Sequence, residues 1–241
     1  MSIIKFYPFS EETRSVFPEP TPSSKNIPEW YKRQPAYGVP EEGQMKVGSS
    51  ASTVKRCMPV FDGITSGYTI YIPCDIFIDA TNPDKLTWSV PLVASQMKRD
   101  LVSSHSPEQV SEYPLETDKY HKELFRILPF WAVGTAKGYS CLFMQPFHRD
   151  PVPFRVFGGI IDTDAFIADG HYSLQIEKGF KGVIERGTPL VQVIPFKMEE
   201  WKMEIVDAQE SNKILSMQRV KIRTKFKNYY RNYLRVPKEY K

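Results

Sequence analysis

Apolar and polar residues alternate in short runs along most of this chain, and Gly, Pro or Asp residues end many of the runs. Alternation with a period of two is typical of a strand that buries one face. Such runs recur at intervals of about ten residues, which indicates a sandwich, jelly roll or closed clip. The predicted strands are residues 67–73, 75–79, 85–90, 130–133, 139–145, 154–161, 172–176, 182–184, 190–196 and 201–206.

Beyond residue 207 the period changes to that of a helix. Ile214, Met217, Val220 and further apolar residues fall near helical spacing, with Lys and Arg between them. Asp207 or Ser211 suits the N-cap, and a proline follows the end of the pattern. The pattern predicts a basic amphipathic helix of about 25 residues.

The first 50 residues hold seven of the 20 prolines, interleaved with aromatic residues. Proline cannot donate to a strand ladder, and the aromatic residues are unlike a disordered tail. We predict an extended arm that docks on the body or on a neighbouring subunit, with Trp30 and Tyr31 as candidate partner-binding residues. The Gly/Ser-rich tract 43–52 is predicted to be a linker.

The predicted organisation is therefore an arm and linker (1–50), a mainly β domain (51–206) and a basic C-terminal helix (207–241). Hydrophobic residues make up 41% and charged residues 25%, as in ordinary globular domains. No apolar run approaches the ~18–20 residues of a membrane span. Three cysteines without CxxC spacing argue against a disulfide framework or a zinc knuckle.

Charge is unevenly distributed along the chain. Residues 211–241 hold ten Lys or Arg and one Glu, a net charge of +9, so the preceding residues carry −5. A basic helix on an acidic body suits an anionic partner, a neighbouring copy included. Nucleic acid bound through residues 213–241 is an alternative. The basic candidate residues are Lys221, Arg223, Lys225, Lys227 and Arg231.

The most specific motif is Gly159-Ile160-Ile161-Asp162-Thr163-Asp164, followed 23 residues after Asp164 by Gly187-Thr188-Pro189-Leu190-Val191-Gln192. This pair of motifs resembles the trimeric dUTPases and the related dCTP deaminases, in which a Gly-x-Ile-Asp-x-Asp-Tyr turn precedes a Gly-to-Gln strand. The resemblance implies a dUTPase-like β-clip, or distorted jelly-roll, domain and a trimeric assembly.

The same resemblance implies a nucleotide site. Asp162 would be the general base for an attacking water, with Asp164 beside it. Phe166 and Gln192 would be nucleotide-binding candidates, and Mg²⁺ would bridge the phosphates. Mg²⁺ is expected only under this interpretation.

Three features of the family pattern are missing, however. The aromatic position of the turn falls on Ala165, with Phe166 one place late. Residues 142–155 contain no Arg-Ser-Gly phosphate-binding segment, and a basic helix replaces the glycine-rich C-terminal arm. These departures favour a scaffold that has lost hydrolysis, with nucleotide binding or hydrolysis through Asp162 as the alternative.

His148-x-Asp150 matches two of the three ligands in the facial triad of iron oxygenases. The third ligand would have to be His171, only 21 residues after Asp150. A turn before two prolines is the simpler interpretation, so His148 and Asp150 are weak metal candidates and no metal or cofactor is predicted.

Nearly the whole chain also resembles an uncharacterised bacteriophage protein family, on residues that include 27–32, 57–59, 66–68 and 201–205. This resemblance implies phage origin, with synthesis in the host cytoplasm. We therefore expect a non-enzymatic β-domain protein that acts through protein–protein surfaces as a virion structural or accessory component. Its expected partners are further copies of itself or other virion proteins, and no membrane.

Overall fold

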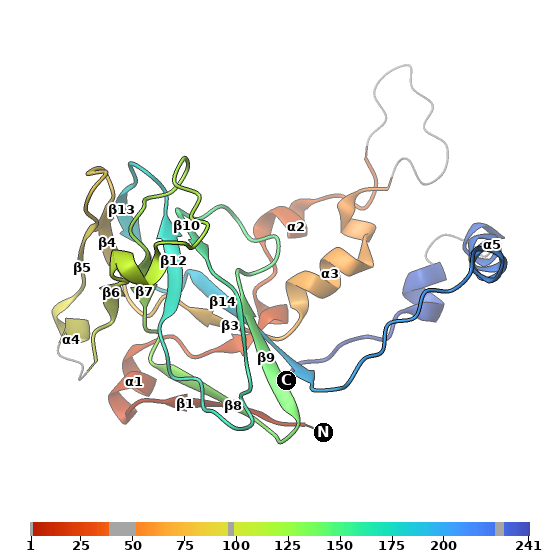
Figure 1. Cartoon of the computed structure of the whole chain (residues 1–241), viewed down its shortest axis with the longest axis horizontal. Coiled ribbons are helices and arrows are strands. Elements are labelled where there is room, and N and C mark those ends of the chain that lie inside the picture. The colour runs from red at the N-terminus through yellow and green to blue at the C-terminus, as the bar shows by residue number, and fades with distance from the viewer. Residues whose placement is uncertain (1, 39–51, 96–98, 225–228) are drawn as a thin grey trace, which may run out of the picture. The chain divides into compact units, whose positions relative to one another are not determined.

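The computed structural model describes residues 2–38, 52–95, 99–224 and 229–241, and it is mainly β (Figure 1). The described residues form 14 strands, all in antiparallel pairs. They are β1 (Ile4–Pro8), β2 (Thr21–Pro22), β3 (Tyr68–Tyr71), β4 (Ile76–Asp79), β5 (Thr87–Ser89), β6 (Val102–Ser104), β7 (Phe125–Ile127), β8 (Trp131–Thr135), β9 (Tyr139–Met144), β10 (Phe154–Val156), β11 (Gly159–Ile161), β12 (Tyr172–Ile176), β13 (Lys181–Ile184) and β14 (Pro189–Lys197).

Helices are short, with one exception near the C-terminus. The α-helices are α1 (Glu11–Val16), α2 (Glu29–Arg33), α3 (Met58–Thr65), α4 (Leu92–Ser95) and α5 (Ala208–Thr224). Single turns of 3₁₀-helix are η1 (Ser23–Lys25), η3 (Val54–Arg56) and η4 (Pro107–Val110), and η5 (Tyr230–Leu234) is a π-helical turn.

Four sheets make up the β body. Their strand orders are β1-β8, β10-β12-β7-β6, β11-β9-β14-β3-β2 and β13-β4-β5. Apolar residues from the last three sheets join one buried cluster, for example Leu174, Val193 and Ile78. The Phe143 and Tyr172 rings, 5.7 Å apart, link the five-stranded and four-stranded sheets. This shared core fixes the positions of the three sheets relative to one another.

The N-terminal residues belong to the β body of their own chain. β1 pairs with β8 along its whole length, and β2 pairs with β3. Phe17 is 3% exposed and stacks on Phe130 at 5.1 Å. The first half of the predicted arm is thus part of the packed body, because it supplies paired strands and core side chains. The predicted linker lies mostly in residues 39–51, outside the described ranges.

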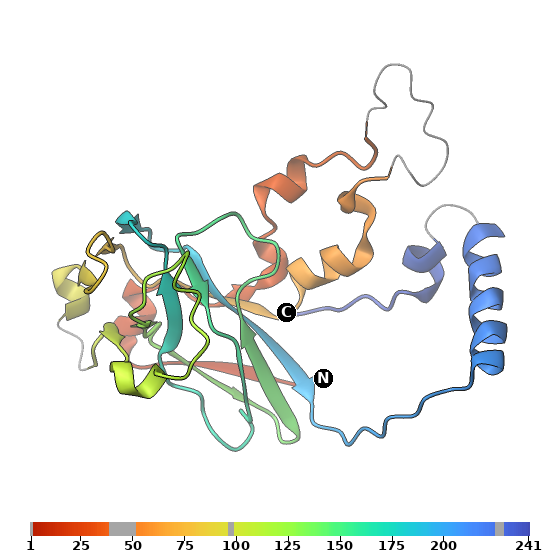
Figure 2. The same cartoon turned by 45° about the horizontal axis from the view of Figure 1, so that its top comes forward.

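The chain divides into two compact units, Met1–Lys197 with Tyr240–Lys241, and Met198–Glu239, which we call the tail segment. α5 is its main element (Figure 2). Asp207 caps this helix, because its Oδ1 accepts the backbone N–H of Gln209 at 2.8 Å and of Glu210 at 3.1 Å. The predicted helix is confirmed over Ala208–Thr224.

The prediction of a strand at residues 201–206 is wrong, because these residues pair with no other strand in the described part of the chain. These residues are without helix or ladder in the structure. Alternating apolar residues favour an extended backbone, but a β-ladder also needs a second strand to hydrogen-bond with. The described part of the chain supplies no such strand for residues 201–206. Within the described ranges, no helix has the length and apolar character to cross a membrane.

Candidate functional site

The two motif segments lie in one sheet, with a single strand between them. β11 pairs with β9 through Ile161 and Cys141, and β14 pairs with the other side of β9 through Gln192 and Met144. The sequence motifs are therefore parts of one antiparallel unit. Their side chains, however, are used in different ways.

The turn Asp162–Asp164 is hydrogen-bonded to the β8–β9 hairpin. Ser140 Oγ donates to Asp162 Oδ1 at 2.8 Å, and the Gly138 N–H donates to Asp164 Oδ2 at 2.8 Å. Between these two residues, Thr163 is 2% exposed, and its hydroxyl bonds that of Thr135 at 2.8 Å. Both carboxylates thus hold a turn in place. Asp162 remains exposed to solvent, while Asp164 is half-buried.

Gln192 is fully buried, with 0% exposure. Its Oε1 accepts the Phe147 N–H at 3.0 Å, and its Nε2 donates to the carbonyls of Gly63 at 2.9 Å and Ser66 at 2.5 Å. These contacts join β14 to α3 and to the loop after β9. The Gln192 side chain thus binds three backbone groups of its own fold. No polar atom of this side chain is open to solvent.

Phe166 is 58% exposed on the turn that follows Asp162. Ile160 on β11 and Ile167 on the same turn are 64% and 50% exposed. The β11 edge and the turn after it therefore each carry exposed apolar side chains. Among the described strands, only β9 pairs with β11.

Trp30 and Tyr31 pack within the chain itself. The Trp30 Nε1–H donates to the His148 carbonyl at 2.7 Å. Tyr31 is 3% exposed, and its hydroxyl donates to the Lys55 carbonyl at 3.1 Å. Tyr31 is therefore a core anchor of α2 rather than a residue that a partner can reach, which corrects its assignment as a candidate contact residue.

The weak metal candidates are both on an exposed turn. His148 and Asp150 are exposed, and His148 has a φ of 51°, as expected of a tight turn. His171 Nε2 lies 2.9 Å from the Asp100 carbonyl. Across the described ranges, no three His, Cys, Asp or Glu side chains come together as a metal-binding group.

The basic candidates lie in the tail segment. Lys221 in α5 and Arg231 in η5 are exposed, and Arg223 also belongs to α5. Lys225 and Lys227 fall outside the described residues. The apolar residues of α5 are about half exposed too: Ile214 48%, Leu215 42%, Met217 51%, Val220 57% and Ile222 49%.

The run that precedes α5 is more exposed still. Trp201, Met203 and Ile205 are 87%, 83% and 86% exposed. They alternate with Lys202 and Glu204, a spacing that brings the three apolar side chains to one face when the run is extended. The alternation of apolar and charged residues in this run is visible in the sequence and predicts a strand. The sequence does not reveal whether another strand lies beside it.

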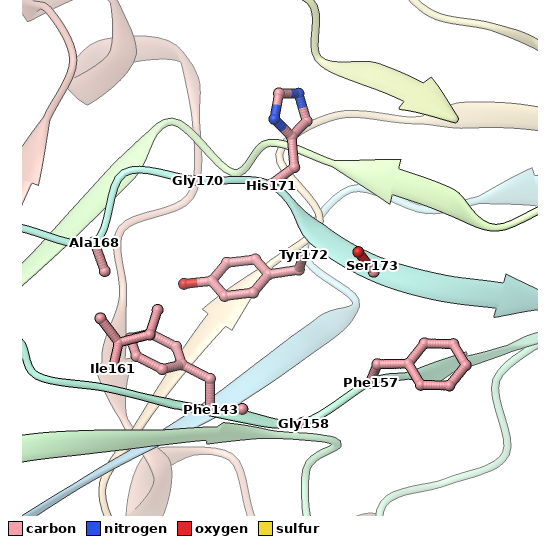
Figure 3. A pocket seen from close by; sticks show the side chains of 10 residues that line it. Phe143, Phe157, Gly158, Ile161, Ala168, Gly170, His171, Tyr172 and Ser173 are labelled. Carbon is pink, nitrogen blue, oxygen red and sulfur yellow. The ribbon is translucent and has the colours of Figure 1, made fainter. Parts of the chain in front are cut away.

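A cleft of about 250 Å³ opens between residues 157–161 and 168–173. Figure 3 shows the Tyr172 ring lying across it toward Ala168 and Ile161, with the Phe143 ring close to Ile161 and the His171 ring directed away. The Tyr172 hydroxyl bonds no group in the described part of the protein, and burial raises its pKa. The cleft therefore offers aromatic and aliphatic walls with the hydroxyls of Tyr172 and Ser173.

No family model, curated protein or solved structure matches this chain. The candidate site is consequently defined by its own geometry. Two separate surfaces are candidates: the exposed apolar run Trp201–Val206 of the tail segment, and the β11 edge with the adjacent cleft.

Proposed function

We propose that this chain is a non-enzymatic β-domain protein that acts through protein–protein contacts, as a structural or accessory component of a bacteriophage virion. The exposure of Trp201, Met203 and Ile205 carries this proposal. Large apolar patches left open to water are typical of interaction sites. An extended strand with one apolar face is the form that adds to the edge of another sheet.

The partner we propose is a second copy of this chain. Its β11 edge offers a strand with one free side and an apolar surface at Ile160. The cleft beside β11 is smaller than the roughly 300–1,000 Å³ of small-molecule sites, and suits an aromatic side chain such as Trp201. The net charge of +9 over residues 211–241 and of −5 over the remainder also favours contact between copies.

The scaffold we propose is a dUTPase-like β-clip. Both motif segments pair with β9, which supports their origin as one unit. Asp164 and Gln192 bind groups of their own fold, which supports a structural role for the motif in place of catalysis. The phage origin rests on the resemblance of residues such as 27–32 and 201–205.

The triple substitution of Trp201, Met203 and Ile205 by serine is expected to abolish self-association. Each apolar side chain contributes about 1.5–3 kcal/mol when it is buried, so the dissociation constant should rise by at least about a hundredfold. Light scattering coupled to size exclusion should give a multiple of the 27.9 kDa chain mass for the wild type and the mass of a single chain for the variant. A wild type that stays monomeric across concentration would refute the proposal.

Mixing two variants tests the geometry of the contact. Ile160→Glu should also be monomeric, because it places a charge on the β11 edge. A mixture of this variant with the serine variant should form a complex, since one supplies an intact strand and the other an intact edge. The double substitution Lys202→Ser and Glu204→Ser is the matched control and should associate as the wild type does.

Incubation with dUTP and Mg²⁺ is expected to release no pyrophosphate. The carboxylate that would act as base, Asp162, accepts the Ser140 hydroxyl, and Gln192 is closed off by three backbone partners. A malachite-green assay with added pyrophosphatase measures turnover. Turnover that disappears in Asp162→Asn would instead establish the nucleotide hydrolase.

A further inference from the structure

A half-buried arginine lies on the four-stranded sheet beside β12, whose residues Tyr172 and Ser173 line the cleft. Arg126 is the middle residue of β7, directly opposite Ser103 of β6 and Ser173 of β12. Residues directly opposite one another on neighbouring strands project from the same face of the sheet. The three side chains therefore form a polar row across β6, β7 and β12.

The guanidinium of Arg126 has few partners. Its Nη2 donates to the Ser104 carbonyl at 3.1 Å, while its Nε is buried with no hydrogen-bond partner. The Ser103 hydroxyl is buried without a partner as well. No carboxylate pairs with Arg126 among the described residues. A half-buried guanidinium with an unpartnered Nε has a donor to offer to an anion.

His105 adds an imidazole whose tautomer the hydrogen bonds define. The Ser106 N–H donates to Gln109 Oε1 at 3.1 Å, which identifies that atom as oxygen. His105 Nδ1, 3.3 Å from the same oxygen, must then carry the proton. Its Nε2 consequently accepts the Ser173 hydroxyl at 2.9 Å. Protonation of His105 would reverse this bond and free the Ser173 proton for a ligand.

His171 is the second imidazole near Arg126. Its Nε2 donates to the Asp100 carbonyl at 2.9 Å, so its Nδ1 is the basic atom. Burial lowers the pKa of both His105 and His171, and the charge of Arg126 lowers both further. Arg99, which pairs with Asp169 at 2.9 Å, acts on His171 in the same direction, and the Asp100 carboxylate opposes it.

We propose that Ser103, His105, Arg126, His171 and Ser173, the Arg126 cluster, bind an oxyanion of the phosphate class. The planar guanidinium supplies parallel donors that match phosphate oxygens. The serine hydroxyls add neutral donors, and each imidazole adds a further donor when it takes up a proton. The anion neutralises the row of partly buried positive groups that the fold leaves without a carboxylate.

The pH dependence follows from the two imidazoles. A bound anion stabilises their protonated forms, so it raises both pKa values toward or above the usual range. Binding in turn strengthens as pH falls through the range in which the imidazoles take up protons. Sulfate, which does not titrate near neutrality, separates this effect from the titration of phosphate itself.

NMR of the histidine C2 protons tests the proposal in the full chain. Addition of inorganic phosphate up to ~50 mM at about pH 6.5 should shift two of the four histidine signals, those of His105 and His171. Sulfate should bind several-fold tighter at about pH 6 than at about pH 8. Arg126→Gln should weaken phosphate at least tenfold and, without ligand, raise the pKa of both imidazoles.

Arg155→Gln is the matched control, because Arg155 lies on β10 of the same sheet and pairs with Glu116. It should leave phosphate affinity unchanged. If Arg126→Gln does not fold, Ser103→Ala should still weaken phosphate about threefold or more. Adenosine monophosphate that binds more tightly than phosphate would identify a nucleotide as the source of the anion, and equal affinities would identify free phosphate.

An absence of histidine shifts, or shifts that persist in Arg126→Gln and Ser103→Ala, would overturn the site. The cluster shares His171 and Ser173 with the lining of the cleft, but it contains none of the residues that the oligomerisation variants substitute. The oligomerisation variants should therefore bind phosphate normally, so either proposal can fail while the other stands.

Discussion

Replacing Gly67 by alanine is expected to lower the free energy of unfolding more than any other substitution considered for this chain. Gly67 has a φ of +67°, and a Cβ built on it would lie 2.0 Å from the Val193 carbonyl oxygen. The residue connects α3 to β3, where β3 joins β14 opposite Val193. A side chain there would push the backbones of two central strands apart.

Two costs combine at this position. A left-handed conformation costs a residue with a Cβ about 1–2 kcal/mol, and the displacement of packed backbone adds typically about 1–3 kcal/mol. The expected loss is therefore about 2–5 kcal/mol, or roughly 10 °C in Tm for a domain of this size. Urea unfolding followed by circular dichroism measures it.

Gly179→Ala is the control for the conformational cost alone. Gly179 has a similar φ of +73°, and a Cβ there would meet nothing within 4 Å. The expected loss is about 1–2 kcal/mol. If both alanine variants lose the same free energy of unfolding, the close approach of β14 to Gly67 does not contribute to the cost.

Gln192→Leu is expected to cost about 3 kcal/mol of unfolding free energy, since a buried polar group that loses its partner costs about 1–3 kcal/mol. Leucine has nearly the volume of glutamine but cannot bond the Phe147 N–H or the carbonyls of Gly63 and Ser66. The C-terminal end of α3 and the loop after β9 should both become more mobile. Faster hydrogen exchange of the Phe147 amide and a lower free energy of unfolding in urea would show this.

Gln175→Leu provides the contrast. Gln175 is as buried as Gln192, yet its Oε1 has no partner and its Nε2 reaches the His121 carbonyl only at 3.4 Å. Because little hydrogen bonding is lost there, the free energy of unfolding should change by less than about 1 kcal/mol. A comparable loss in both leucine variants would attribute the effect to the polar-to-apolar change and not to the three bonds of Gln192.

The strands of the central and later chain could be predicted because their own residues specify them. β9 and β14 are long, alternate or run apolar, and are bounded by Gly and Pro. β6 and β7 were missed because three residues are too few to show a period. β1 alternates between half-buried and exposed residues, but the prolines that follow it hid the pattern.

The candidate sites were harder to predict, since they depend on pairing between distant segments. Ser103, Arg126 and Ser173 meet only through the register of β6, β7 and β12. No spacing along the chain reveals such a row. Asp162 and Gln192 could be singled out from a motif, but their hydrogen-bond partners Ser140 and Gly63 belong to other elements.

The end of the chain returns to the β body after the tail segment. Tyr240 packs edge-on against Tyr68 at 5.8 Å, and the Tyr68 hydroxyl donates to the Lys241 carbonyl at 3.2 Å. Both ends of the tail segment are thus attached to the β body, and a closed loop has fewer conformations to lose on docking than a free end.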